Sequence, residues 1–161
     1  MENILAWMES TTLSRWSYEF TWWFPAMEII HFLGLSILLG SIMVVDLRIL
    51  GFERAIPIRP ATAFIPIAIF GFSLNVLSGI AFLFADPFRY WPNIAWRIKM
   101  ILIILAGLNA LWFSLREHRK VVALPEGADT DMSAKLCAGG SLIFWVAIIT
   151  LGRLIPYLED S

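Results

Sequence analysis

The sequence predicts an all-α integral membrane protein, an up-and-down bundle of four spanning helices with a short N-terminal interfacial helix. Of its 161 residues, 59% are hydrophobic and only 16% are charged, against about 25% charged in soluble domains. Mean hydropathy is +0.75. Four apolar stretches are long enough to span, because about 20 helical residues cross a hydrocarbon core of about 30 Å. We expect the spans at about 22–50, 63–84, 93–115 and 134–157, within a single transmembrane domain covering 1–161.

Charge and cysteine content exclude several classes of protein. The formal net charge is -1 and no segment gathers a basic patch, so nucleic acid is not an expected partner. The single cysteine, Cys137, permits no internal disulfide and no cysteine-based zinc or iron–sulfur site within one chain. The partner that the composition does indicate is the lipid bilayer.

Local signals mark where the helices begin and end. The first twenty residues lack the basic start, unbroken apolar core and cleavage site of a signal peptide, and their mixed apolar and charged pattern suits a helix on the membrane surface. Pro57 and Pro60 interrupt the chain after the first span. Ser133 is a candidate N-cap for the fourth span, and Asn75 and Asn109 need hydrogen-bond partners within the protein.

Four spans place both termini on one side of the membrane, and the distribution of Lys and Arg predicts which side. The first and third loops with their helix ends carry Arg48, Arg54, Arg59, Arg116, Arg119, Lys120 and Lys135, whereas the other side carries Arg15, Arg89, Arg97, Lys99 and Arg153. Under the positive-inside rule the termini are outside the cytoplasm. For a bacterial inner membrane this is the periplasmic side.

The first span carries the most informative residues. Glu28 and His31 lie one helical turn apart, and Gly34 follows on nearly the same face. An ionisable group at membrane depth is expensive and is a functional hypothesis by default. Imidazole is also a common metal ligand.

The antiparallel order of the spans indicates which residues share a depth. His31 lies about eight residues into the first span and Lys99 about five into the third, which puts their Cα atoms within about 5 Å of the same level. His118 is a membrane thickness away, so one chain cannot ligate a cofactor with both histidines. The half of the membrane that contains His31 also holds Ser78, Gly79, Gly152 and Arg153.

Two segments carry a family resemblance. The segments EIIHFLGLSILLGSIMVVDLRILG (28–51) and AWRIKMILIILAGLNALWF (95–113) resemble the HemJ type of four-helix bacterial membrane protein, proposed protoporphyrinogen oxidases that bind haem b. They are also similar to CopD-like membrane proteins. The whole chain resembles an uncharacterised family of small bacterial four-helix membrane proteins. The HemJ-type motif maps onto His31, Gly34, Arg48 and Lys99.

The resemblance implies one haem b in the outer half of the bilayer, with His31 as the axial ligand and metal-binding residue. Gly34, Ser78 and Gly79 would make room for the macrocycle. Arg97 and Arg153 would pair with the propionates, because guanidinium groups bind carboxylates bidentately. Lys99 would be a second ligand, a propionate partner or a proton donor. The implied function is electron transfer or redox chemistry with a partner that no sequence feature identifies.

Other functions fit the same residues. Glu28, His31 and Lys99 could relay protons in a transporter without any cofactor. A HemJ-like porphyrinogen oxidase is a further alternative, which leaves open whether the protein is an enzyme, and so is a structural subunit. His31 could also simply hydrogen-bond a neighbouring helix, while Lys99 snorkels to the interface.

Small residues on several helices predict self-association. They cannot all face one bundle interior, and small residues allow close helix contacts. We therefore expect a closed, symmetric homo-oligomer with a dimer as its smallest unit, compatible with a trimer of dimers. The residues are Ser36, Gly40, Ala106, Ala110, Gly139 and Gly140.

Overall fold

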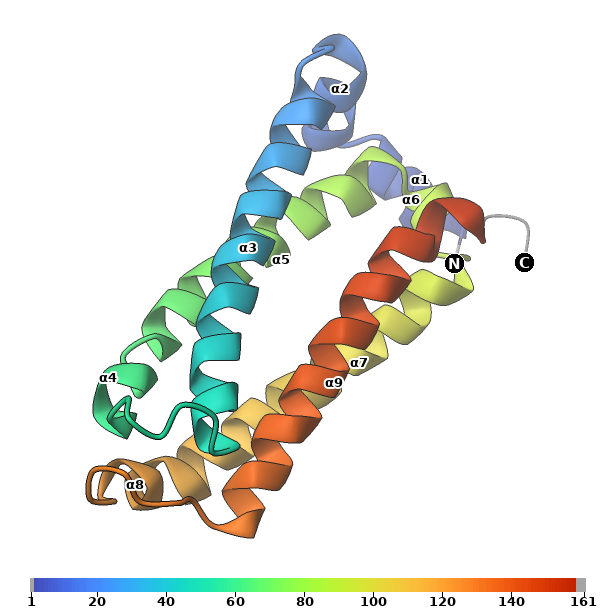
Figure 1. Cartoon of the computed structure of the whole chain (residues 1–161). Coiled ribbons are helices and arrows are strands. Elements are labelled where there is room, and N and C mark those ends of the chain that lie inside the picture. Colours follow the sequence, from blue (N-terminus) through green and yellow to red (C-terminus); the bar gives the residue numbers. More distant parts are fainter. Residues whose placement is uncertain (1, 159–161) are drawn as a thin grey trace.

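The computed structural model describes residues 2–158, and within them every regular element is a helix. Four long apolar helices dominate: α3 (Trp23–Ile49), α5 (Ile65–Ala85), α7 (Ile94–Trp112) and α9 (Met132–Leu154). Each is long and apolar enough to cross a membrane (Figure 1). The predicted all-α fold with four membrane-spanning helices is therefore confirmed.

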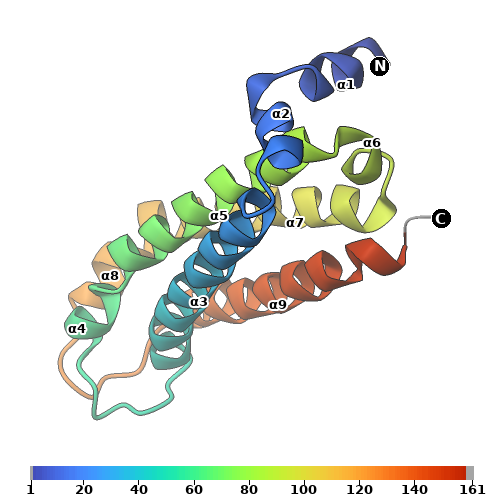
Figure 2. The same ribbon diagram turned by 90° about the horizontal axis from the view of Figure 1, so that it is seen from above.

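Both chain ends lie at the same end of the bundle, which we call the terminal end, and α4 (Ile58–Thr62) and α8 (His118–Val122) lie at the opposite, loop end (Figure 1). Two short helices cover the terminal end where one was expected, α1 (Glu2–Glu9) and α2 (Thr12–Glu19). They are separate because Thr11 caps α2, accepting a hydrogen bond from the Ser14 backbone N–H. Figure 2 shows them beside the end of α5. There the Tyr18 hydroxyl donates to the Ala85 carbonyl at 3.2 Å.

The four long helices form two pairs. α3 packs along α5, α7 packs along α9, and the pairs are joined where α3 meets α9. α5 and α7 are consecutive, connected through the short helix α6 (Pro87–Tyr90), yet they have almost no direct packing. In Figure 1, α3 and α9 diverge from the loop end toward the terminal end. The bundle is therefore closed at one end and open at the other.

Different interactions hold the two helices of each pair together. In the first pair Gly34 and Gly71 let the α3 and α5 backbones meet, since a Cβ atom on Gly71 would lie 2.6 Å from the Leu38 nitrogen. In the second pair, asparagine side chains bond to carbonyl oxygens. Asn109 Nδ2 donates to Cys137 O at 2.9 Å, and Asn93 Nδ2 donates at 2.9 Å to Ile155 O, at the start of the 3₁₀ turn Ile155–Tyr157.

The third span continues beyond its expected end near residue 115. It passes through a π-helical turn, η1 (Phe113–Glu117), into α8. Burial explains the extension, because Val121 is 2% exposed in an apolar cluster that includes Ile49 of α3. Glu117 is buried too and its carboxylate bonds to Lys120 Nζ at 3.1 Å. Ser133 does not cap α9; Asp131 occupies the N-cap, and Ser133 hydrogen-bonds Glu117 instead.

Asp129 ties the loops of the loop end together. Its carboxylate accepts hydrogen bonds from Lys135 Nζ at 2.8 Å and from the Thr130 N–H at 3.0 Å, and it pairs with Arg54 at 3.0 Å. These partners, Lys135 first, hold the pKa of Asp129 below its ordinary value. Gly51, with φ at +94°, makes the left-handed turn that lets the chain leave α3 toward Arg54.

Candidate functional site

His31 is held between two helices in a defined orientation. Its Nδ1 lies 2.8 Å from Ser78 Oγ. The hydroxyl of Ser78, on α5, has only one proton, and it donates that proton to the Leu74 carbonyl at 2.7 Å. In the tautomer with its proton on Nδ1, His31 donates to Ser78 Oγ and Nε2 keeps its lone pair. Nε2 makes no hydrogen bond within residues 2–158.

The third spanning helix, α7, places a lysine near the imidazole. Lys99 of α7 is close enough to His31 for a Coulombic interaction, as expected from their shared depth. Its Nζ lies 3.3 Å from the position that a Cβ on Gly152 would occupy, so the lysine stem covers this glycine of α9. The edge of Phe82, with ring centroids 5.6 Å apart, also contacts the imidazole. His31, Ser78 and Lys99 thus form a half-buried cluster that three helices contribute to.

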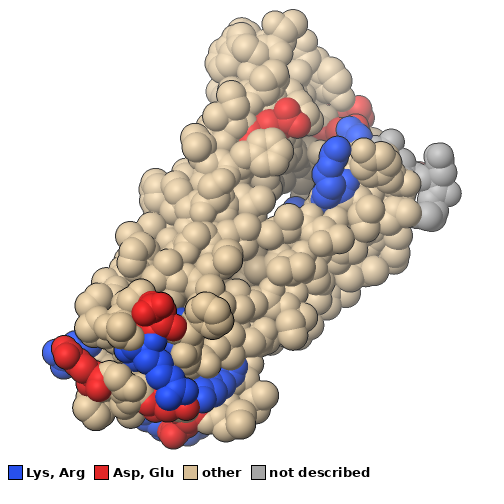
Figure 3. Space-filling view, viewed as in Figure 1, with Lys and Arg blue, Asp and Glu red and all other residues tan. Residues whose placement is uncertain are grey.

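One face of the molecule is hollowed near the terminal end. The space-filling view shows a hollow between the two helix pairs near the terminal end, with basic side chains on one border (Figure 3). Gly79 of α5 has nothing within 4 Å of a built Cβ. Gly34 differs, because its Cβ would lie 2.7 Å from Asn75 Nδ2 and 2.9 Å from Gly71 O. Gly34 therefore serves the α3–α5 contact and does not border open space.

The remaining charged residues near the terminal end are at the surface. Arg97, Arg153 and Glu28 are exposed. The guanidinium of Arg153 lies over the Tyr157 ring, 5.5 Å from its centroid. Glu28 forms no ion pair with either arginine in the described chain. Neither guanidinium is paired with a carboxylate in the described chain, although Arg153 also donates to the Tyr157 hydroxyl at 3.3 Å.

Arg48 and His118 are at the loop end, away from His31. His118 begins α8, and its ring contacts Phe113. Arg48 is 3% exposed and donates through Nε to the Ile56 carbonyl, while its terminal nitrogens meet no partner among residues 2–158. The structure thus separates Arg48 from the other residues that the family motif groups with it.

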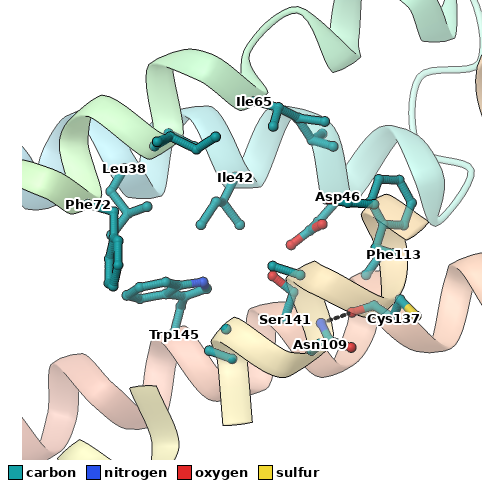
Figure 4. Close-up of a pocket in the computed structure, with 18 of the residues that line it drawn as sticks. Leu38, Ile42, Asp46, Ile65, Phe72, Asn109, Phe113, Cys137, Ser141 and Trp145 are labelled. Atoms are coloured by element: carbon teal, nitrogen blue, oxygen red, sulfur yellow. Dashed lines mark hydrogen bonds between the residues drawn. The ribbon is translucent and has the colours of Figure 1, made fainter. Parts of the chain in front are cut away.

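A buried acid was missed as a site residue by the sequence analysis. Asp46 of α3 is 7% exposed and lines a pocket of about 240 Å³ between the two helix pairs. Figure 4 shows its carboxyl oxygens directed toward Ser141 of α9, with Asn109 of α7 nearby. Matching depths along α3, α7 and α9 would have brought these three residues together, because each is an isolated polar residue in an apolar helix.

His31 is the residue of this cluster that could hold a metal ion or a metal cofactor, through Nε2. Within residues 2–158 no group of three or more His, Cys, Asp and Glu side chains gathers as a metal site. A macrocycle that supplies its own equatorial ligands needs only an axial ligand such as one imidazole. A hydrogen bond between Nδ1 and Ser78 would hold the ring in place, as the outer partners of metal-binding histidines commonly do.

Comparisons with known proteins leave the family open. No family model, no curated protein and no solved structure matches this chain. Any functional assignment therefore depends on the geometry of its own residues.

Proposed function

We propose that this protein binds one haem b between its helix pairs in the half of the membrane nearest the termini, with His31 as an axial ligand. The function would be electron transfer or redox chemistry. The observation that carries the proposal is the position of His31: Nδ1 lies 2.8 Å from Ser78 Oγ, and Nε2 makes no hydrogen bond in the described chain. A neutral imidazole with its proton on Nδ1 can bind iron through Nε2 without losing a proton.

The surrounding residues have separate tasks in this proposal. Ser78 is a positioning residue, because its acceptor lone pair holds the ring in place. Lys99 supplies a positive charge that would stabilise an anionic group or complete the coordination from the α7 side. Arg97 and Arg153, exposed at the terminal end, would bind carboxylates bidentately. When bound, the haem would supply a one-electron couple whose potential depends on ligation, polarity and solvent access.

The open end of the bundle is consistent with a bound group. α3 and α9 diverge toward the terminal end (Figure 1), and the hollow of Figure 3 lies there. Gly79 borders open space, while Gly34 is used for helix packing. The resemblance to the HemJ-type and CopD-like haem proteins, carried by His31 and Lys99, supports the same choice of cofactor.

A second candidate is proton transfer without a cofactor. The proximity of Lys99 to His31 favours it, since two ionisable groups from different helices at membrane depth are typical of proton relays. Glu28 would extend the relay by one helical turn. A proton relay requires no coloured group, which makes the two candidates easy to separate.

Absorption spectroscopy of the purified full-length protein tests the haem proposal. We expect a Soret band and a pyridine haemochrome of the b type in the unmodified chain. His31→Ala should purify as a folded helical protein without the band, whereas His118→Ala should keep it, because His118 lies at the loop end. Equal haem content in the two variants, or no haem in the unmodified chain produced with ample haem, would overturn the assignment.

A further inference from the structure

A second site lies in the other half of the bundle, independent of the proposed haem. Asp46 follows His31 by 15 residues on α3, which is about 22 Å along a helix. The pocket of about 240 Å³ beside it is lined by residues of the four long helices and of η1. Its walls are largely apolar, with aromatic side chains from Phe72, Phe113 and Trp145 (Figure 4).

The polar groups of this pocket are hydrogen-bond acceptors without enough donors. Asp46 Oδ2 is buried and has no hydrogen-bond partner in the described chain. The Asn109 amide Nδ2 donates a hydrogen bond to the Cys137 carbonyl at 2.9 Å, so its Oδ1 remains for a ligand. Ser141 faces Asp46 and its hydroxyl hydrogen-bonds the carboxyl group (Figure 4). Oδ2 is the carboxyl oxygen left without a partner, and a ligand that supplies a further donor would satisfy it.

The charge balance of the pocket specifies the ligand further. None of the described residues that line it is Lys, Arg or His. A carboxylate in an apolar site is stable only when a cation or several donors meet it. A carboxylate with no cation among the residues around it favours an ammonium ion over a neutral donor. The Phe72 and Trp145 rings, 6.1 Å apart and edge to face, offer an apolar surface to the rest of the ligand.

The pocket opens sideways. Its lining includes Ile69 of α5, which is 60% exposed, and the exposed residues Gly107 and Ala110 of α7. α5 and α7 scarcely pack against each other, so the mouth lies between them on the apolar flank of the bundle. A ligand that enters by this route comes from the bilayer and must itself be lipophilic.

We propose that the pocket at Asp46 binds a lipophilic monoamine in its protonated form, entering from the membrane between α5 and α7. The ammonium meets Asp46 Oδ2 and Asn109 Oδ1, and the apolar body fills the space lined by Phe72, Ile103 and Trp145. The volume suits a small compact molecule, since an apolar cavity of about 150 Å³ already accommodates benzene.

A matched pair of probes tests the proposal on the full-length protein in phosphatidylcholine nanodiscs. 1-Aminoadamantane is a compact apolar cage with one ammonium group, and 1-adamantanol is its neutral counterpart. Isothermal titration calorimetry against protein-free nanodiscs separates binding from partition into lipid. We expect saturable 1:1 binding of the amine, about tenfold or more tighter than that of the alcohol, as a charge-assisted hydrogen bond provides.

Two variants assign the selectivity to Asp46. Asp46→Asn should reduce the affinity for the amine about tenfold or more and leave the weaker binding of the alcohol nearly unchanged. Glu126→Gln removes an exposed carboxylate near the same end of the bundle and should change neither. Equal affinities of the two probes for the unmodified chain, or no saturable binding of either, would overturn the proposal. This comparison uses only the unmodified chain, so it tests the proposal even if Asp46→Asn does not fold. Haem content is not expected to change in any arm.

Discussion

The contact between α3 and α5 makes a strong prediction about Gly71. A Cβ atom added there would lie 2.6 Å from the Leu38 nitrogen and 2.7 Å from the Gly34 oxygen. Both are backbone atoms of α3, so no side-chain rotation relieves the overlap and the two helices must separate. Overpacking of this kind costs typically about 1–3 kcal/mol. The alanine gains up to about 1 kcal/mol in helix propensity, so the net loss of stability in Gly71→Ala lies between about 0 and 3 kcal/mol.

Gly40 provides a matched control on the other helix of the same pair. It is exposed, and nothing lies within 4 Å of a Cβ built on it. Within a single chain, Gly40→Ala should therefore be neutral or stabilising by up to about 1 kcal/mol, so this comparison is made at a detergent concentration where the chain is monomeric. The two variants share the chemical change and differ only in what the new methyl group meets.

The assay is reversible unfolding in detergent, with helicity followed by circular dichroism during titration with a denaturing detergent. We expect Gly71→Ala to unfold at a lower denaturant fraction than the unmodified chain, and Gly40→Ala at the same or a higher one. Equal midpoints for the two variants would refute the close approach of α3 and α5. That result would also undermine the His31–Ser78 geometry, which requires the same helix spacing.

Three further predictions concern the loop end, the topology and the assembly. Asp129→Asn should lower the stability of the protein at pH 7. Because the partners of Asp129 hold its pKa low, the stability difference from the unmodified chain should shrink only as the pH falls below about 4, where the carboxyl protonates. A stability difference that does not change with pH would contradict this. A reporter fused after Ser161 should behave as extracytoplasmic and one inserted within 125–131 as cytoplasmic; the reverse pattern would invert the assigned orientation. Light scattering with the bound detergent subtracted should give a dimer or a multiple of it, and a monomer with its full haem complement would show that no neighbour is needed.

The four spans could be predicted from the sequence because length and apolarity alone determine them. The pairing of the helices could not. Helices in a membrane are apolar on all sides, so hydrophobic periodicity does not reveal which face packs. The separation of α5 from α7, despite their short connection, and the π-helical turn at Phe113–Glu117 both depend on tertiary contacts that no local pattern encodes.

The candidate site shows the same division. The shared depth of His31 and Lys99 followed from counting residues along antiparallel helices, and their Coulombic interaction agrees with it. The assignment of Gly34 to a cofactor did not anticipate its contact with Gly71, since a glycine in a helix has the same sequence signature in either role. The sequence does not single out Asp46, because an acid near a loop is ordinarily solvated.

The most direct test of the central proposal is chemical rescue of the iron ligand. His31→Gly removes the imidazole and leaves space beside Ser78, so the purified variant should lack the Soret band. Adding free imidazole together with haem should give a b-type spectrum that stays with this variant through gel filtration, which separates it from the imidazole–haem complex that also forms in protein-free detergent. Full haem binding by His31→Gly without imidazole, or no recovery when imidazole saturates, would contradict the assignment of His31 as the haem ligand.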